Sequence, residues 1–256
     1  MRPRPGHVLV TGASSGLGRA LALAYATPGR RLSLLGRDAG RLAEVAAAVE
    51  TAGAEAMTVA VDVRDRAAMA DAVAAADDAR PLDLVIANAG IAAAVDPRDV
   101  LEVNLLGLWH TVEPALARMG ARGHGQLALM SSLAGRRGLP GAAAYGAAKA
   151  GARVLAESLR LDWGPRGVRV SAIVPGFVDT PLTRRNNFAM PFRLTAEEAA
   201  ERIRRGLARD RAEIAFPRRL AWAVRLSTLL PPAAAAPLLR RGRAAAERPG
   251  IKPPSS

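Results

Sequence analysis

The chain of 256 residues is 50% hydrophobic and carries a formal net charge of +13. That hydrophobic share supplies a large core and argues against global disorder, and the length suits one α/β domain. No cysteine is present, which excludes disulfides, thiolate metal sites and a cysteine nucleophile. The three histidines, His7, His110 and His124, are not at metal-ligand spacing, so we expect no metal.

The positive charge is concentrated near the C-terminus. Residues 201–256 hold thirteen Lys or Arg and four Asp or Glu, which gives +9 of the +13. Nearly all basic residues are Arg, with Lys only at Lys149 and Lys252, so the high pI reflects a compositional bias. We therefore expect no nucleic-acid partner. The N-terminus lacks a signal peptide pattern and no apolar run could span a bilayer, so we expect a cytoplasmic protein.

Short apolar runs alternate with amphipathic stretches rich in alanine and leucine. We expect strands at residues 7–11, 31–36, 55–61, 82–87, 126–131, 168–174 and 213–216. We expect helices at residues 16–26, 39–51, 65–76, 100–118, 145–163 and 195–208. Strands that are apolar without alternation are typical of a parallel sheet covered on both faces. The pattern therefore predicts an α/β fold with a doubly wound parallel sheet.

A long loop over residues 175–194 interrupts this alternation. It holds three prolines and two adjacent asparagines, and loops of this length are usually functional. We expect its residues 182–194, together with the short segment after Gly90, to shape a substrate pocket. Its apolar side chains Phe188, Met190, Pro191 and Phe192 favour an apolar ligand.

The first strand ends in a glycine-rich turn at residues 11–18, Thr-Gly-Ala-Ser-Ser-Gly-Leu-Gly, where a helix begins. Glycines let the backbone approach a pyrophosphate closely, and a helix N-terminus offers free N–H groups. The spacing differs from the usual Rossmann Gly-x-Gly-x-x-Gly, and an ordinary tight turn is the alternative. The position between the first strand and the first helix favours nucleotide binding.

The second strand ends in Arg37 and Asp38, at the point that faces the adenosine ribose in dinucleotide-binding folds. An acidic residue there binds the 2′-hydroxyl of NAD, whereas an arginine accommodates the 2′-phosphate of NADP. Because Arg37 comes first, NADP(H) is favoured and NAD(H) stays possible. Alternatively, Arg37 is a surface residue and Asp38 caps the next helix.

Tyr145 and Lys149 are four residues apart on an expected helix and so share one face. A free tyrosine titrates near pH ~10, and a nearby ammonium lowers that pKa. Lys149 stands out in a chain that uses arginine almost everywhere, and a compact ammonium bonds ribose hydroxyls in a way that a planar guanidinium does not. Taken alone, the pair could be a helix surface pair.

Several motifs occur together and in order. They are the glycine-rich turn, Asn88-Ala89-Gly90, Ser132, Tyr-x-x-x-Lys, and Pro175-Gly176 followed by Thr180. Over roughly residues 7–181 this combination resembles the short-form branch of the short-chain dehydrogenase/reductase family. The resemblance implies a single Rossmann-type domain with about seven parallel strands. It also implies an NAD(P)-dependent oxidoreductase acting on a carbonyl or secondary alcohol.

The resemblance assigns a role to each matching residue. Tyr145 would be the proton donor and Ser132 would orient the carbonyl. Lys149 would lower the pKa of Tyr145 and bind the nicotinamide ribose, while Asn104 would hold a water that links Lys149 to solvent. The residues expected to contact the cofactor are Gly12, Ser14, Ser15, Gly16, Leu17, Gly18, Arg37, Asp62, Val63, Asn88, Ala89, Gly90, Tyr145, Lys149, Pro175, Gly176, Val178 and Thr180.

Two features depart from the family pattern. The stretch between Asn88 and Asn104 is short, and the C-terminus lacks the Asp-Gly-Gly ending that helps to build tetramers. We therefore favour a homodimer over a tetramer. A nucleotide-sensing Rossmann protein without chemistry is the alternative function, but a sensor does not need the complete acid–base set. A nucleic-acid-binding protein that uses the basic tail is a third reading, which too few aromatics and no recognised motif oppose.

We place the catalytic domain at residues 1–216 and a basic, apolar extension at 217–256, with a disordered end. Within the extension, helical spacing brings one apolar stripe together: Trp222, Leu226, Leu229 and Leu230. The favoured interpretation is that this stripe packs on the domain's own core or on a second subunit. The alternative is a peripheral membrane contact through residues 218–243.

Overall fold

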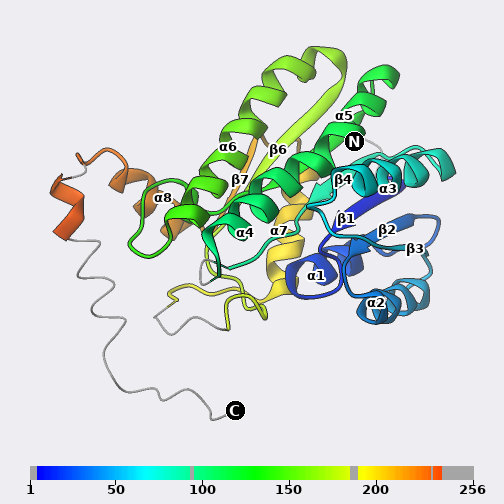
Figure 1. Ribbon diagram of the computed structural model, residues 1–256, viewed down its shortest axis with the longest axis horizontal. Coiled ribbons are helices and arrows are strands. Elements are labelled where there is room, and N and C mark those ends of the chain that lie inside the picture. Colours follow the sequence, from blue (N-terminus) through cyan, green and yellow to red (C-terminus); the bar gives the residue numbers. More distant parts are fainter. Residues whose placement is uncertain (1–4, 93–94, 185–189, 232, 238–256) are drawn as a thin grey trace, which may run out of the picture.

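Seven strands form one sheet at the centre of the molecule (Figure 1). The computed structural model describes residues 5–92, 95–184, 190–231 and 233–237. Neighbouring strands are all parallel, in the order β3-β2-β1-β4-β5-β6-β7. The strands are β1 His7–Thr11, β2 Arg31–Gly36, β3 Glu55–Ala60, β4 Leu84–Ala87, β5 Gly125–Met130, β6 Val168–Pro175 and β7 Glu213–Phe216.

Helices cover both faces of this sheet. They are α1 Gly16–Tyr25, α2 Ala39–Thr51, α3 Arg66–Ala79, α4 Pro97–Leu101, α5 Gly107–Arg122, α6 Ala143–Trp163, α7 Ala196–Ala208 and α8 Arg218–Ser227. Within β1, Val8 and Val10 belong to the core beneath α1, α2 and α7, and Leu9 to the core beneath α3, α5 and α6. Side chains on both faces of the strand are therefore buried, which explains the continuous apolar run. The predicted doubly wound parallel sheet is confirmed.

The helix expected at residues 100–118 is wrong in its bounds and its continuity. It begins earlier because the Asp96 side chain accepts a hydrogen bond from the Arg98 N–H and Pro97 occupies the first turn. A π-helical turn, Glu102–Leu106, separates α4 from α5. α5 then runs to Gly123, whose φ of 66° ends it. The other expected elements are present, with bounds shifted by up to three residues.

The apolar stripe of the tail does not pack on the domain's own core, so that part of the expectation is wrong. α8 instead turns Leu220 and Ala221 toward the core. Trp222 and Leu226 are 56% and 59% exposed, and Leu229 and Leu230, which follow the helix, are exposed as well. Helical spacing shows which residues share a face, but both faces of α8 are apolar. Residues 238–256, including the predicted disordered end, lie outside the described residues.

A buried carboxylate connects α3 with β4 and α5. Asp77 is 7% exposed and accepts hydrogen bonds from the Leu82 N–H and the Arg122 Nη1, each 2.8 Å away. Arg118 Nη1 lies 3.3 Å from the same carboxylate. Burial raises the pKa of Asp77, but the hydrogen bonds from Leu82 and Arg122 outweigh it and leave this pKa below its usual value. The carboxylate therefore stays ionised and bonded.

Replacing Asp77 with alanine should lower the free energy of unfolding by about 2 kcal/mol, because it leaves the Leu82 N–H and the Arg122 guanidinium without their acceptor. Asp78→Ala is the matched control. Asp78 also bonds Arg118, but its side chain is 67% exposed, so the loss should stay below about 1 kcal/mol. Urea unfolding of both variants checks this, and equal losses would contradict it.

Candidate active site

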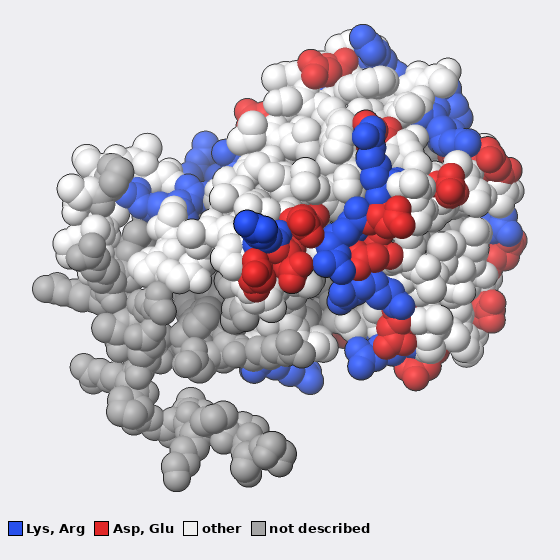
Figure 2. Space-filling model, viewed as in Figure 1, with Lys and Arg blue, Asp and Glu red and all other residues white. Residues whose placement is uncertain are grey.

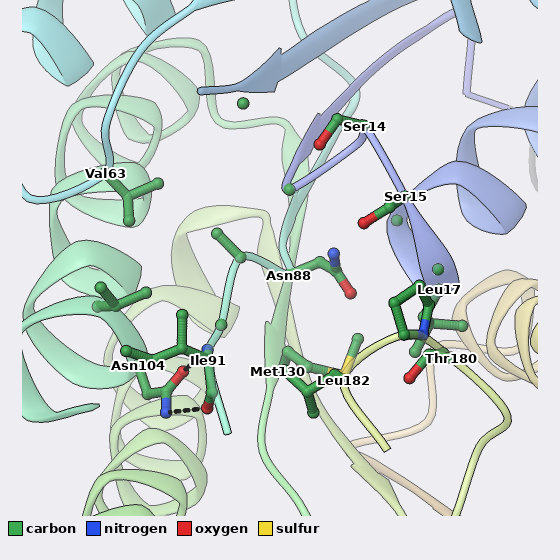
Figure 3. Close-up of a pocket in the computed structure, with 18 of the residues that line it drawn as sticks. Ser14, Ser15, Leu17, Val63, Asn88, Ile91, Asn104, Met130, Thr180 and Leu182 are labelled. Atoms are coloured by element: carbon green, nitrogen blue, oxygen red, sulfur yellow. Dashed lines mark hydrogen bonds between the residues drawn. The ribbon is translucent and has the colours of Figure 1, made fainter. Parts of the chain in front are cut away.

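A cavity of about 740 Å³ lies at the carboxyl ends of the strands. It opens between β1 and β4, where the order of the strands in the sheet reverses direction. Ligands of doubly wound sheets bind at such a switch point. Figure 3 shows Ser14 and Ser15 on the turn after β1, with Asn104 and Ile91 across the cavity. Thr180, after β6, closes a third side. The chain therefore gathers widely separated segments around one space.

Every site residue proposed from the sequence lines this cavity, including those expected for catalysis. Several lining residues were not proposed: Gly36, Asp38, Arg41, Val61, Val103, Met130, Ser131 and Pro181. Most of them adjoin a proposed residue in the chain, and that adjacency was the available signal. Within the part of the chain that the structure describes, no group of His, Asp or Glu could hold a metal ion.

The loop expected to shape the pocket does so only in part: Leu182 and Thr183 line the cavity, as does Ile91 after Gly90. Met190, Pro191 and Phe192 do not line the cavity, and Phe192 is 54% exposed with φ at 58°. A backbone bridge between Val178 and Leu194 fixes the end of the loop beside β6. Phe188 lies outside the described residues. Their assignment to the pocket is thus not supported by the described residues.

The glycine-rich turn is built for close backbone approach. Gly12 and Gly16 have φ of 67° and 52°, a region that favours glycine. A Cβ added at Gly18 would lie 2.0 Å from the Gly12 carbonyl oxygen. Ser15 begins α1 without a side-chain cap, so the first N–H groups of α1 are not bonded by it. The turn thus fits a pyrophosphate group.

Thr11 joins the ends of β1 and β4. Its hydroxyl accepts hydrogen bonds from the Asn88 and Ala89 N–H groups at 3.0 and 3.1 Å. The Asn88 side chain donates to the Thr11 carbonyl at 2.9 Å. Sequence reasoning did not give Thr11 a role. A hydroxyl at the end of an otherwise apolar strand was the available signal.

Arg37 and Asp38 follow β2 in the cavity wall and differ in their bonding. The Asp38 side chain accepts a hydrogen bond from the Arg41 N–H at 3.0 Å and lies 3.2 Å from Arg41 Nε. It therefore caps α2, as the alternative reading expected. Arg37 is exposed at the cavity and makes no hydrogen bond or ion pair with any described residue.

Asp62 carries a negative charge in the cavity wall after β3. Its carboxylate accepts a hydrogen bond from Arg64 Nη2 at 2.8 Å. Hydrogen bonds from Arg64 lower the pKa of Asp62 below its usual value. The carboxylate is therefore ionised and oriented by a neighbour two residues along the chain.

Lys149 is a buried ammonium in the wall of the cavity. It is 3% exposed, and its Nζ donates to the Met130 carbonyl at 3.0 Å. The Ser131 hydroxyl donates to the Lys149 carbonyl at 2.6 Å, which holds α6 against the end of β5. Burial lowers the pKa of Lys149 to about 8. One of its three N–H donors is used within the described residues, so two remain for other partners.

The pKa of Tyr145 shifts in the direction opposite to the sequence prediction. Burial raises it, and the neighbouring Ser132 hydroxyl only partly opposes this rise. Lys149 Nζ lies 5.7 Å from the centre of the Tyr145 ring, and burial lowers the pKa of this ammonium. Among the protein groups alone, desolvation therefore decides the direction.

Asn104 sits in the π-helical turn and is fully buried. Its Oδ1 accepts from the Ile91 N–H at 2.9 Å, and its Nδ2 donates to the Ile91 carbonyl at 3.0 Å (Figure 3). A Cβ added at Gly90 would lie 2.7 Å from Asn104 Oδ1 and 3.6 Å from Lys149 Nζ. Asn104 thus fixes the segment after β4. Its water-holding role remains a prediction.

Ser132 faces Tyr145 from the end of β5. Its hydroxyl accepts a hydrogen bond from the Ala134 N–H at 3.2 Å and donates to the Pro175 carbonyl at 3.4 Å. The second bond is long, so the hydroxyl hydrogen can turn to another acceptor. Ser132 and Tyr145 together can donate hydrogen bonds to one carbonyl oxygen, while Lys149 supplies positive charge behind them.

Comparison with known proteins gives the class of this fold and site. The family model for short chain dehydrogenases matches residues 6–190. An uncharacterized oxidoreductase of Myxococcus xanthus is 41% identical over 232 residues, which cover 87% of this chain and 92% of that protein. The chain belongs to the short-chain dehydrogenase/reductase family. It is an NAD(P)-dependent oxidoreductase that acts on an alcohol or carbonyl group.

Two solved structures extend the comparison. A short-chain dehydrogenase from Sphingobium yanoikuyae in complex with NADPH has a TM-score of 0.77 at 24% identity, covers 97% of this chain and is itself covered to 98%. At this identity it supports the fold alone. A short-chain dehydrogenase from Mycobacterium paratuberculosis bound to NAD has a TM-score of 0.73 at 26% identity, covers 82% of this chain and is covered to 94%.

Lys149→Met should raise the free energy of unfolding at neutral pH by about 2 kcal/mol, because it removes a buried charge and keeps the side-chain volume. The folded pKa of about 8 lies below the usual value of 10.5, so the folded state bears the full desolvation penalty below pH 8. The unmodified protein gains stability as pH rises from that value, while the unfolded chain still holds its proton. The advantage of the variant should therefore shrink above pH 8.

Urea unfolding of both proteins across that pH range measures the effect. Lys149→Arg is the control, since it keeps the charge and should bring no gain. A methionine variant that is less stable at every pH would contradict the expectation.

Proposed function

We propose that this enzyme transfers a hydride reversibly between NADP(H) and an apolar ketone or secondary alcohol. The apolar side chains of Ile91, Val103 and Leu182 in the cavity wall support an apolar substrate. One observation carries the proposal: Ser132, Tyr145 and the buried Lys149 converge on the cavity that the glycine-rich turn also lines. The glycine cradle, the uncapped start of α1 and the two remaining donors of Lys149 fit a dinucleotide. The cofactor, when bound, supplies the hydride for reduction and accepts it in oxidation.

The proton that the substrate oxygen gains on reduction would come from the Tyr145 hydroxyl. The hydroxyls of Ser132 and Tyr145 would both donate hydrogen bonds to the substrate oxygen. The raised pKa of Tyr145 keeps the phenol protonated beforehand. As the carbonyl carbon is reduced, negative charge develops on its oxygen and the Tyr145 proton moves there. Charged Lys149 would stabilise the phenolate that remains and offer its free N–H groups to ribose hydroxyls.

The preference for NADP over NAD rests on the two residues after β2. Asp38 is committed to the backbone and side chain of Arg41, so it is a poor partner for a ribose 2′-hydroxyl. Arg37 is exposed at the cavity with its guanidinium available for a bidentate phosphate contact. The same pair thus disfavours the NAD contact and favours the NADP contact.

Arg37→Asp should weaken NADPH binding about 10- to 100-fold, because it removes a charge-assisted hydrogen bond and adds a like charge. NADH binding should change much less. Fluorescence titration with both cofactors measures the ratio. Arg202→Asp, an exposed substitution on α7 away from the cavity, controls for net charge. An Arg37 variant with an unchanged cofactor ratio would contradict the NADP assignment.

Tyr145→Phe should reduce turnover at least about 100-fold and leave NADPH binding nearly intact, because only the acidic hydroxyl is lost. Lys149→Arg should also lose most activity despite keeping its charge, since a planar guanidinium cannot direct its donors as the compact ammonium that bonds the Met130 carbonyl does. Steady-state assays with NADPH and a panel of ketones check both. Near-normal turnover of the arginine variant would argue against the compact-ammonium role.

The assembly and boundaries complete the proposal. We propose a homodimer in the cytoplasm, with a catalytic domain over residues 1–216 and an extension over 217–256. Among the described residues, no helix is long and apolar enough to cross a membrane.

A further inference from the structure

α8 has two different apolar faces. Leu220 and Ala221 pack against the core on one side. On the other side Trp222 and Leu226 are more than half exposed, and Leu229 beyond the helix end is 78% exposed. An exposed tryptophan among leucines on one short segment is unusual for a surface that meets only water. We call these four exposed side chains the outer face of α8: Trp222, Leu226, Leu229 and Leu230.

The charge around the outer face has one sign. Arg218, Arg219 and Arg225 are exposed on the same helix, and the Arg225 guanidinium lies 5.5 Å from the centre of the Trp222 ring. The sequence contains no acidic residue from position 214 to position 246. In Figure 2 the atoms over α8 are blue and white, whereas both signs mix over the rest of this view. The face combines apolar and cationic groups without anionic ones.

The outer face stands on an anchored segment. Arg137, in the loop after β5, donates from Nη1 to the Ser227 carbonyl and to the Leu230 carbonyl, the latter at 3.0 Å. These bonds satisfy carbonyls that the end of a helix leaves open. Leu139 in the same loop is 38% exposed. The end of α8 is therefore tied to the domain while its apolar side chains stay outward.

We propose that the outer face of α8 docks on the surface of an anionic lipid bilayer. Tryptophan and leucine enter the interface favourably, and flanking arginines meet anionic headgroups. A second copy of the chain is the poorer occupant, because a two-fold contact through this face would bring the same arginines together.

Docking would place the bilayer next to the active-site cavity. A Cβ added at Gly176, which lines the cavity, would lie 3.0 Å from Leu220 Cδ2 and 3.2 Å from Pro217 Cδ. The inner side of α8 thus touches the cavity wall while its outer side meets lipid. An apolar substrate could then pass from the bilayer to the site. Only this last step rests on the proposed function.

Sedimentation of the full-length protein with phosphatidylglycerol or phosphatidylcholine vesicles tests the docking. We expect binding to the anionic vesicles alone, and its loss at about 1 M salt, where the Debye length falls to about 3 Å. Trp222→Ser and Leu226→Ser should each weaken binding about tenfold. Leu161→Ser, on α6 and 73% exposed, is the matched control and should bind as before.

Other results would overturn the proposal. Unchanged vesicle binding by the Trp222→Ser/Leu226→Ser double variant would remove the outer face from the contact, and equal binding to both vesicles would remove the role of the arginines. No vesicle binding, with a dimer that dissociates in the double variant, would assign the face to a second copy. NADPH titration of the same samples tests the cofactor site separately, so failure of one proposal leaves the other measurable.

Discussion

One hydroxyl group holds the two strands between which the cavity opens. β4 is four residues long and pairs with β1 at three positions, so little backbone pairing remains where both strands end. The Thr11 hydroxyl extends this pairing by accepting from two successive N–H groups. A Cβ added at Gly12 would lie 2.9 Å from the Ala89 Cα, so the two segments are in close contact there. The glycine-rich turn and the segment that faces Lys149 are thereby placed relative to each other.

The same region contains a buried positive charge, the Lys149 ammonium, whose desolvation lowers the stability of the fold. Burial disfavours the Lys149 ammonium, as its lowered pKa indicates, yet the surrounding groups keep it in place. The Met130 carbonyl accepts a hydrogen bond from the Lys149 ammonium, and the Ser131 hydroxyl donates one to the Lys149 carbonyl, so both anchors come from the end of β5. Residues kept despite a stability penalty are typical of sites where chemistry sets the sequence. In a chain that uses arginine almost everywhere, a lysine kept at this buried position supports its proposed catalytic role.

Much of the fold followed from the sequence because buried parallel strands leave a strong apolar pattern. The cavity lining followed from motif order, since strand ends in a parallel sheet meet at one edge. The sequence did not show whether Asp38 faces a ribose or caps α2, because an acidic residue suits both roles. The direction of the Tyr145 pKa depends on desolvation, which no spacing reveals. The face of α8 that turns inward is set by tertiary packing against Gly176 and Leu133. The division after residue 216 remains a prediction.

The π-helical turn at residues 102–106 sets the phase between two parts of one nearly continuous helical segment. A π turn contains one residue more than an α-helical turn, and each residue advances the helix by about 100°. Asn104 is buried toward Ile91, whereas Val112 and Leu116 are buried toward the sheet. Removing one residue from this turn would therefore rotate Asn104 by about 100° relative to the core-facing side chains of α5. The two could then no longer reach the cavity and the core at the same time, even though none of these side chains had changed. The extra residue lets a single element serve a binding cavity and a hydrophobic core that lie in different directions.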